Sequence, residues 1–339
     1  MPVDPSEPAP VPETAPPPAA QAVDAVVIGR NEGARLLACL DSLSGQARRI
    51  VYVDSGSSDG SAAAAAARGA LVVSLDLGRP FTAARARNAG LARLEAAPGG
   101  AAALIQFIDG DCTLVPGWID RAAAFLAQHP RAAVACGRRR ESHPEASLYN
   151  RLCDHEWNTP VGEARACGGD ALIRRDALRA VGGFDATLIA GEEPDLCLRL
   201  RAAGWQVWRL DAEMTRHDAR ILRFGQWWRR SRRAGHAFAE GAWRHGRGPE
   251  RHWVAETLRA LGWGAALPAA ILGAALLCSP WAGLAVLAYP AQIARIAARG
   301  IPAEIALFTV LAKFPEAQGA LGFCWDRLRG RRRGLVEYK

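Results

Sequence analysis

Short apolar runs alternate with amphipathic stretches along the first two thirds of the chain. Runs of strand length lie at 24–28, 50–53, 70–74 and 104–108, and a stripe of leucines between positions 36 and 43 has helical spacing. Because short connections join strands and helices in alternation, the pattern predicts an α/β fold with a doubly wound, mainly parallel sheet. The same patterns predict helices at 61–68, 82–95 and 118–128, strands at 132–136 and 205–210, and an irregular region through Trp157 and Pro160.

The strand at 104–108 ends in two aspartates, Asp109 and Asp111, separated by Gly110. In an open α/β sheet, ligands bind beyond the carboxyl ends of the strands. Two carboxylates there are hard oxygen ligands that suit Mg²⁺ or Mn²⁺, and such a cation usually also contacts substrate phosphates. An ordinary turn would also explain Asp-Gly-Asp, so the spacing by itself leaves both interpretations open.

Other polar segments follow or precede predicted strands. The loop 54–60 has hydroxyls and backbone N–H groups that suit a nucleoside, although Asp59 is equally compatible with a helix start. A glycine-rich turn at 166–170 leads into a strand. The acids of 191–195 open a helix, where the helix dipole favours them, or present a carboxylate at the rim of a site. His217 follows the strand at 205–210, and a lone histidine is more often structural than a ligand.

Five motifs, in this order, resemble those of a family 2 glycosyltransferase with the GT-A nucleotide-sugar fold. The resemblance covers roughly 24–217. Ser55 departs from the family pattern, which has a second aspartate there, and Glu193 replaces an aspartate with a longer acid. The motifs are Arg30-Asn31-Glu32 after the first strand, 53–60, Ala86-Arg87-Asn88, Asp109-Gly110-Asp111 and 191–196.

The resemblance implies a metal-dependent, inverting transfer of a sugar from a nucleoside diphosphate to a glycan or lipid-linked acceptor. A UDP-sugar is the preferred donor, by family frequency. The implied metal ligands for Mn²⁺ or Mg²⁺ are Asp109, Asp111 and His217, and the general base is Glu193, with Glu192 as its competitor. The implied donor-binding residues are Arg30, Asn31, Glu32, Asp54, Asp59, Arg87, Asn88 and Asp109, and the acceptor-binding residues are Gly168, Gly169 and Asp170.

The residue types suit this chemistry on their own terms. A cation held by Asp109 and Asp111, with Arg87 nearby, would stabilise the leaving diphosphate. A carboxylate such as Glu193 would deprotonate the acceptor hydroxyl. No residue stands out as a separate nucleophile for a double displacement, which favours inversion.

The last third of the chain has a different character. Residues 261–294 include no charged residue, and this run of 34 residues exceeds the roughly 20 that one helical span needs. Pro280 and Pro290 interrupt it, which predicts a membrane hairpin of two short spans or a re-entrant pair; a soluble Ala- and Gly-rich helical subdomain is the alternative. Arginines flank both ends, so both ends are expected on the cytoplasmic face of the inner membrane.

These observations divide the chain into five predicted regions. They are a disordered Pro/Ala-rich tail at 1–22, a catalytic domain at 23–219, basic amphipathic interfacial helices at 220–258, a membrane hairpin at 259–299, and an interfacial helix with a basic tail at 300–339.

Composition narrows the remaining alternatives. The net charge of +8 suits phosphorylated substrates, anionic lipid or nucleic acid, but the basic residues cluster beside the apolar run, which argues against nucleic acid. The eight cysteines are scattered without a C-x-x-C pair, which predicts reduced thiols and no zinc site. A nucleotidyltransferase and a non-catalytic sugar-nucleotide-binding membrane scaffold remain as alternative functions.

Overall fold

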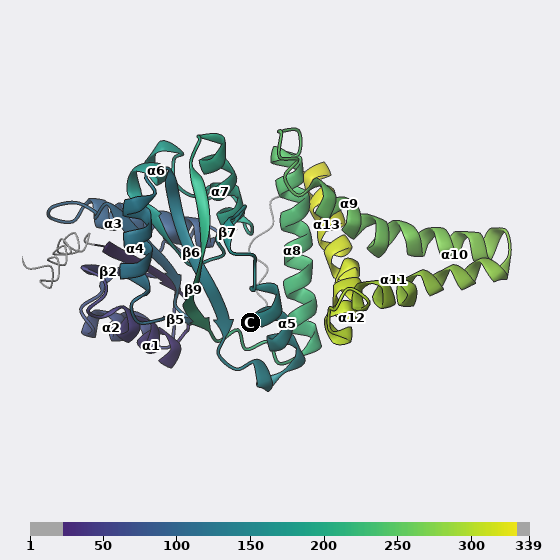
Figure 1. The fold of residues 1–339 in the computed structure, drawn as a ribbon, viewed down its shortest axis with the longest axis horizontal. Coiled ribbons are helices and arrows are strands. Elements are labelled where there is room, and N and C mark those ends of the chain that lie inside the picture. Colours follow the sequence, from purple (N-terminus) through teal and green to yellow (C-terminus); the bar gives the residue numbers. More distant parts are fainter. Residues whose placement is uncertain (1–22, 331–339) are drawn as a thin grey trace, which may run out of the picture.

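The computed structural model describes residues 23–330 of the chain (Figure 1). The predicted tail at 1–22 and the last residues of the predicted basic tail, 331–339, lie outside the described residues. A single nine-stranded sheet, in the order β3-β2-β1-β4-β8-β6-β9-β5 with β7 beside β9, forms the centre of the first two thirds.

The first half of the sheet follows the predicted α/β pattern. Strands β1 (Val23–Gly29), β2 (Arg49–Asp54), β3 (Leu71–Ser74) and β4 (Leu104–Asp109) are parallel. Most of their apolar side chains are buried against one another and against the connecting helices. The connecting helices are α1 (Ala34–Leu43), α2 (Ser61–Ala67) and α3 (Ala83–Glu95).

The second half of the sheet is mixed. Strand β8 (Ala171–Arg174) runs antiparallel between β4 and β6 (Ala132–Glu141), and β9 (Gln206–His217) runs parallel to β6. The short strands β5 (Cys112–Leu114) and β7 (Gly162–Glu163) run antiparallel to β9. Six strands therefore share one direction and three oppose it, which confirms a mainly parallel sheet. The helices of this half are α4 (Trp118–Gln128), α6 (Arg175–Ala180) and α7 (Glu192–Ala202).

Two sequence-based expectations are corrected here. Strands β6 and β9 continue past 136 and 210 because they pair with each other through bulges, so His217 is the last residue of a strand and not part of a loop. The region expected to be irregular includes a 3₁₀ turn at Pro144–Ala146 and helix α5 (Leu148–Glu156). Ser147 caps α5 by accepting the Asn150 backbone N–H at 3.0 Å.

The last third is helical. Helix α8 (Phe224–His245) and α13 (Lys313–Leu328) lie side by side next to the sheet domain, and α10 (Leu267–Leu277) and α11 (Ala288–Ala297) project away from it (Figure 1). The outgoing leg is continuous from Val254 to Leu277, and by length and composition it is one helix able to cross a membrane, with a mean hydropathy of 1.8. The remaining elements are α9 (Val254–Leu261), the π-turn η2 (Gly262–Ala266), the 3₁₀ segment η3 (Pro280–Leu287) and α12 (Ala303–Leu311).

Helix α8, which lies in the region expected to be interfacial at 220–258, packs on both sides. Toward α13, Gly235 and Gly319 allow a close crossing: a Cβ on either would lie 2.0 Å from a backbone oxygen of the other helix. Toward the sheet domain, Arg230 pairs with Glu156 at 2.7 Å. The helix thus connects the sheet domain to the helical layer.

Candidate active site

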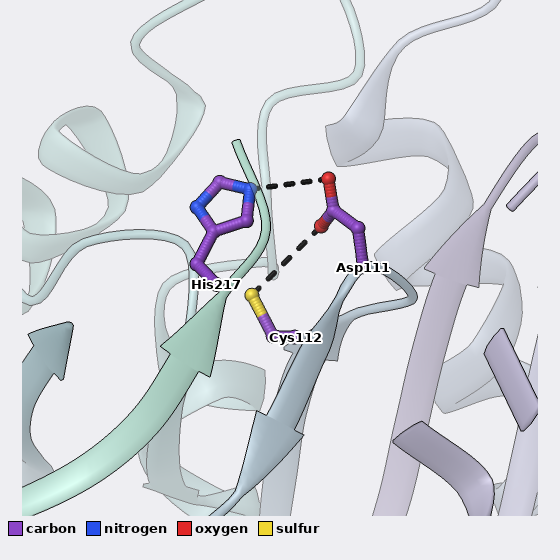
Figure 2. Close-up of side chains that lie close together, drawn as sticks. All are labelled: Asp111, Cys112 and His217. Atoms are coloured by element: carbon purple, nitrogen blue, oxygen red, sulfur yellow. Dashed lines mark hydrogen bonds and ion pairs between the residues drawn. The ribbon is translucent and has the colours of Figure 1, made fainter. Parts of the chain in front are cut away.

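Strand pairing brings Asp111 and His217 together. Cys112 at the start of β5 faces His217 at the end of β9 in the antiparallel ladder, and Asp111 immediately precedes Cys112. His217 Nε2 lies 3.1 Å from Asp111 Oδ2, and both side chains are buried (Figure 2). Trp157 stacks on the His217 ring with a centroid distance of 4.9 Å, which fixes the orientation of the imidazole.

This pair fits a divalent cation. Burial and the neighbouring Arg139 lower the pKa of His217 to about 4, so the imidazole is neutral at pH 7 and has a lone pair to donate. His217 Nδ1 is buried without a hydrogen-bond partner in the described residues. Asp111, Cys112 and His217 place one potential ligand atom each within 4.8 Å of one another, but burial raises the pKa of Cys112 and keeps it a thiol. One carboxylate and one imidazole favour a transition-metal ion such as Mn²⁺ over Mg²⁺, which prefers oxygen donors.

Asp109 belongs to a different group from Asp111. Its Oδ1 accepts from Arg87 Nη2 at 2.8 Å, and the other terminal nitrogen of Arg87 donates to Glu192 Oε1 at 2.7 Å. Burial alone would lower the pKa of Arg87, but Asp109 and Glu192 more than offset this and raise it, so the guanidinium stays charged. One buried cation thus joins the Asp-x-Asp motif to the start of α7, and Glu192 serves as a partner of Arg87.

The glycine-rich turn before β8 closes over this group. Arg87 also donates to the Gly169 carbonyl oxygen at 3.2 Å, and a Cβ at Gly169 would lie 2.7 Å from Asp109 Oδ2. Asp170 is fully buried; it accepts the Asp109 backbone N–H at 3.0 Å and the Thr215 hydroxyl at 2.8 Å. The contacts of Asp170 in the described residues are therefore those of a structural centre that orients Asp109.

Arg139 is a site residue that the sequence analysis missed. It pairs with Asp170 at 2.8 Å, lies 3.8 Å from Asp109 and stands over the Trp157 ring. Its position within the Arg138–Arg140 run at the end of β6 was the available signal, since arginine at a strand end faces the ligand side of such a sheet.

The loops after β1 and β2 hold each other. Asp54 is buried, and its carboxylate accepts the Tyr52 hydroxyl and the backbone N–H groups of Gly56 and Ser57 at 3.0–3.1 Å. Asn31 has a left-handed backbone, with φ at 56°, and its side chain accepts the Ser58 N–H at 2.8 Å. The two loops therefore form one preorganised edge beside β4.

Three further predicted donor-binding residues have structural partners. Asp59 accepts the backbone N–H groups of Gly33 and Ser61, both at 3.0 Å, so it ties the first loop to the start of α2. Asn88 bonds both backbone groups of Phe184, at 2.7 and 3.0 Å, and so fixes a turn. Glu32 pairs with Arg35 in the first turn of α1, whereas Arg30 is exposed at the rim.

Glu193 lies next to Glu192 at the start of α7 but has different surroundings. Its Oε1 accepts the Cys167 backbone N–H and lies 3.3 Å from Cys197 Sγ. Burial raises the pKa of Glu193, whereas the bonds from Cys167 act in the opposite direction. Among the described residues, Cys167, Glu193 and Cys197 form the second cluster of potential metal ligands.

Comparisons with known proteins indicate the family and the fold. Residues 24–182 match the sequence model of the family described as Glycosyl transferase family 2, a match that ends before Glu192 and His217. Over 152 residues, 40% of this chain and 30% of the relative, the chain is 29% identical to the pre-mycofactocin glycosyltransferase of Mycobacterium tuberculosis. It spans less than a third of the length of that relative.

Two solved structures share the fold over nearly the whole chain. One is the mannosyltransferase PcManGT from Pyrobaculum calidifontis, in complex with GDP-Man and Mn²⁺, with a TM-score of 0.63, 21% identity and coverage of 93% of this chain and 92% of that one. The other is residues 1–349 of TarS from S. aureus, with a TM-score of 0.51, 15% identity and coverage of 91% and 92%. Residues 24–182 therefore form a family 2 glycosyltransferase domain, within a chain that has the GT-A fold.

Proposed function

We propose that the chain is a metal-dependent, inverting glycosyltransferase that moves a sugar from a nucleoside diphosphate to a glycan or lipid-linked acceptor. The observation that carries the proposal is the junction made by Arg87. The guanidinium of Arg87 binds both Asp109 and Glu192. The carboxyl end of β4, where the metal ion is proposed to bind, and the acidic start of α7 therefore lie next to the same charged side chain. A donor diphosphate and an acceptor hydroxyl can therefore meet between them.

Each group has a part in a single displacement. Asp111 and His217 would hold Mn²⁺, which when bound neutralises charge on the leaving diphosphate. The loops of Asn31 and Asp54 would position the nucleoside, and Arg87 would keep Asp109 oriented. The acceptor oxygen forms a bond to the anomeric carbon while the bond to the diphosphate breaks, and the acceptor proton passes to Glu193. Attack opposite the leaving group inverts the anomeric centre.

The proposed setting is the cytoplasmic face of the inner membrane. The uncharged stretch 261–294 is projected away from the catalytic domain and flanked by arginines, which supports membrane attachment. A lipid-linked acceptor would then reach the site from the side of the helical layer. UDP is the preferred nucleotide, although the structural neighbour named above holds GDP-Man.

A screen of UDP- and GDP-sugars for binding with and without Mn²⁺ tests the proposal. We expect Asp111→Asn to remove most Mn²⁺-dependent donor binding by calorimetry. Asp41→Asn is the matched control, because Asp41 pairs with Arg68 on the surface of the protein. Unchanged Mn²⁺-dependent affinity in Asp111→Asn would overturn the metal assignment. Donor binding without metal-dependent turnover would instead indicate a non-catalytic scaffold.

A further inference from the structure

We propose that the hairpin formed by α10, η3 and α11 enters the membrane from one side and ends inside the hydrocarbon core without crossing it. This inference rests on the membrane attachment proposed above and concerns its depth. A hairpin of this depth makes the protein monotopic. Its tip lies in lipid, and the arginines on both sides of the uncharged stretch lie on the same side of the membrane as the catalytic domain.

Beyond its base, the apolar surface of the hairpin is not buried by the rest of the described protein. Within the described chain, no residue between Ala260 and Ala306 is buried. Near the tip, Leu277 is 87% exposed and Trp281 78%. A Cβ placed on Gly273 or Gly283 would meet no atom within 4 Å. An uncharged projection of this size in water would be unfavourable, and lipid is the occupant that its composition fits.

The base of the hairpin can be located. Tyr289 donates its hydroxyl to the Trp263 carbonyl oxygen at 2.8 Å and stacks on Phe314 with a centroid distance of 5.5 Å. One residue further out, a Cβ on Gly264 would clash with the Lys313 carbonyl oxygen of α13. Beyond this level the legs leave the body of the protein. Aromatic rings at the base suit the level of the lipid headgroups.

The legs are too short to cross a bilayer. Residues 264–277 rise about 1.5 Å each, so the outgoing leg extends about 20 Å beyond the base. The hydrocarbon core is about 30 Å thick. The full helix from Val254 has the length for a span, but Glu256 and Arg259 lie in its first part, which packs beside α13. The free part therefore ends about 10 Å short of the opposite surface.

The tip is built to tolerate hydrocarbon. Backbone groups there need partners within the protein, because lipid supplies none. The Cys278 and Ser279 N–H groups both donate to the Ala274 oxygen, at 3.0 and 3.1 Å, and Pro280 has no N–H. Ser279 in turn accepts from the Trp281 N–H through its hydroxyl and from the Ala282 N–H through its carbonyl oxygen. A turn that emerged into water would not need these internal hydrogen bonds, because water could bond the same backbone groups.

Arginines lie near the base of the hairpin on both of its legs. Arg259 precedes the outgoing leg, and Arg295 and Arg299 follow the returning one; all three are exposed. Arg295 lies six residues beyond Tyr289, within about 10 Å of the base along a helix. These positions suit anionic lipid headgroups on the catalytic side, and no charged residue lies near the tip to reach the other side.

Cys278 at the tip supplies the test. Of the eight cysteines, Cys278 and Cys324 are exposed and the other six are buried. The full chain with Cys324→Ser is bound to vesicles of phosphatidylethanolamine and phosphatidylglycerol, and a charged, impermeant maleimide is added outside or enclosed inside. We expect Cys278 to react from neither side, and all seven cysteines of the Cys324→Ser chain, Cys278 included, to react after unfolding in SDS. The control combines Cys278→Ser, Cys324→Ser and Ala66→Cys, whose new thiol on α2 should react from outside alone.

The other outcomes each overturn a distinct step. Reaction of Cys278 with the enclosed reagent means that the hairpin crosses, so the depth is wrong although membrane attachment stands. Reaction with external reagent on vesicle-bound protein means that the hairpin does not insert. Failure to sediment with vesicles refutes membrane attachment itself and leaves the donor-binding screen unaffected. A vesicle-free dimer with Cys278 protected would assign the tip to a second copy of the chain.

Discussion

Replacing Glu193 with glutamine would remove the proposed base and keep the atom that anchors the side chain. Oε1 of Glu193 accepts the Cys167 backbone N–H, and a glutamine oxygen can accept the same bond. The donor and metal sites should therefore be unchanged, while no carboxylate remains at position 193 to take the proton of the acceptor hydroxyl. A general base contributes about 10²–10⁴-fold, or about 3–5 kcal/mol, so we expect kcat to fall by that factor with the donor Kd unchanged.

The assay is the release of nucleoside diphosphate at saturating donor and Mn²⁺, with the donor that the screen identifies. The pH profile adds a second readout. Burial raises the pKa of Glu193 above its ordinary 4.5, and the base acts in its charged form. The rate should therefore fall as the pH is lowered through that raised pKa, and Glu193→Gln should lack this acid limb.

Glu192→Gln is the matched control, because the two acids are adjacent but bonded differently. Glu192 pairs with buried Arg87 at 2.7 Å, and loss of a charged hydrogen bond costs about 1.5–3 kcal/mol. We expect a Tm lower by roughly 2–4 °C per kcal/mol and a milder loss of rate. Glu193→Gln should be at least as stable as the parent at pH 7, since a carboxyl with a raised pKa is destabilising once charged.

The reverse pattern would refute this reasoning. Near-normal turnover in Glu193→Gln with collapse in Glu192→Gln would assign the base to Glu192. Near-normal turnover in both would make the acid cluster structural.

Asp59→Ala should lower the free energy of unfolding by about 1–2 kcal/mol in denaturant melts, because it leaves the Gly33 and Ser61 N–H groups unbonded. An unchanged midpoint would contradict the role of Asp59 in joining the first loop to α2. Gly319→Leu should strongly destabilise the chain, because its Cβ would overlap the Arg232 carbonyl oxygen, whereas Gly273→Leu in the hairpin should be neutral in the same melts. Arg295→Gln and Arg299→Gln should each weaken binding to anionic vesicles about five-fold, the equivalent of about 1 kcal/mol, and Arg68→Gln should not; equal sedimentation of all three would remove the arginines from the lipid contact.

The first half of the sheet was predictable because its strands are apolar runs that end abruptly in polar loops. The strand that ends at Asp109 and the loop of Asp54 could be placed at one edge of the sheet from this pattern alone. The predictions for β6 and β9 ended too early, because β6 closes with the charged run 138–141 and β9 has charged residues at 211, 213 and 216. Only their pairing with each other shows that they continue. Helix α5 was missed because few of its residues are buried, Asn150 and Cys153 among them.

The candidate site was predictable in part because its acids follow apolar strands directly. The motifs indicated acids at strand ends, but which acids meet depends on long-range pairing. Asp111 reaches His217 through the β5–β9 ladder, and Arg87 reaches Glu192, 105 positions away in the chain, through packing of α3 against α7. Arg139 carries no local signal that separates it from Arg138 and Arg140. Arg138 and Arg139 are almost equally buried, so the contacts of Arg139 with Asp109 and Asp170 are what distinguish the central member.

Packed side chains connect Glu193, the proposed base, to the helical layer. Asp195, two residues after Glu193, bonds His245 of α8 at 2.7 Å and Arg199 of its own helix at 2.9 Å. Arg244 of α8 holds Asp185 at 2.9 Å, just before the loop that leads into α7. Since α8 crosses α13 closely and α13 contacts the base of the hairpin, packed helices fix the position of Glu193 relative to the proposed membrane surface. A base held at fixed height above the headgroups suits an acceptor whose hydroxyl is itself fixed there, which is a property of lipid-linked glycans and not of freely diffusing sugars.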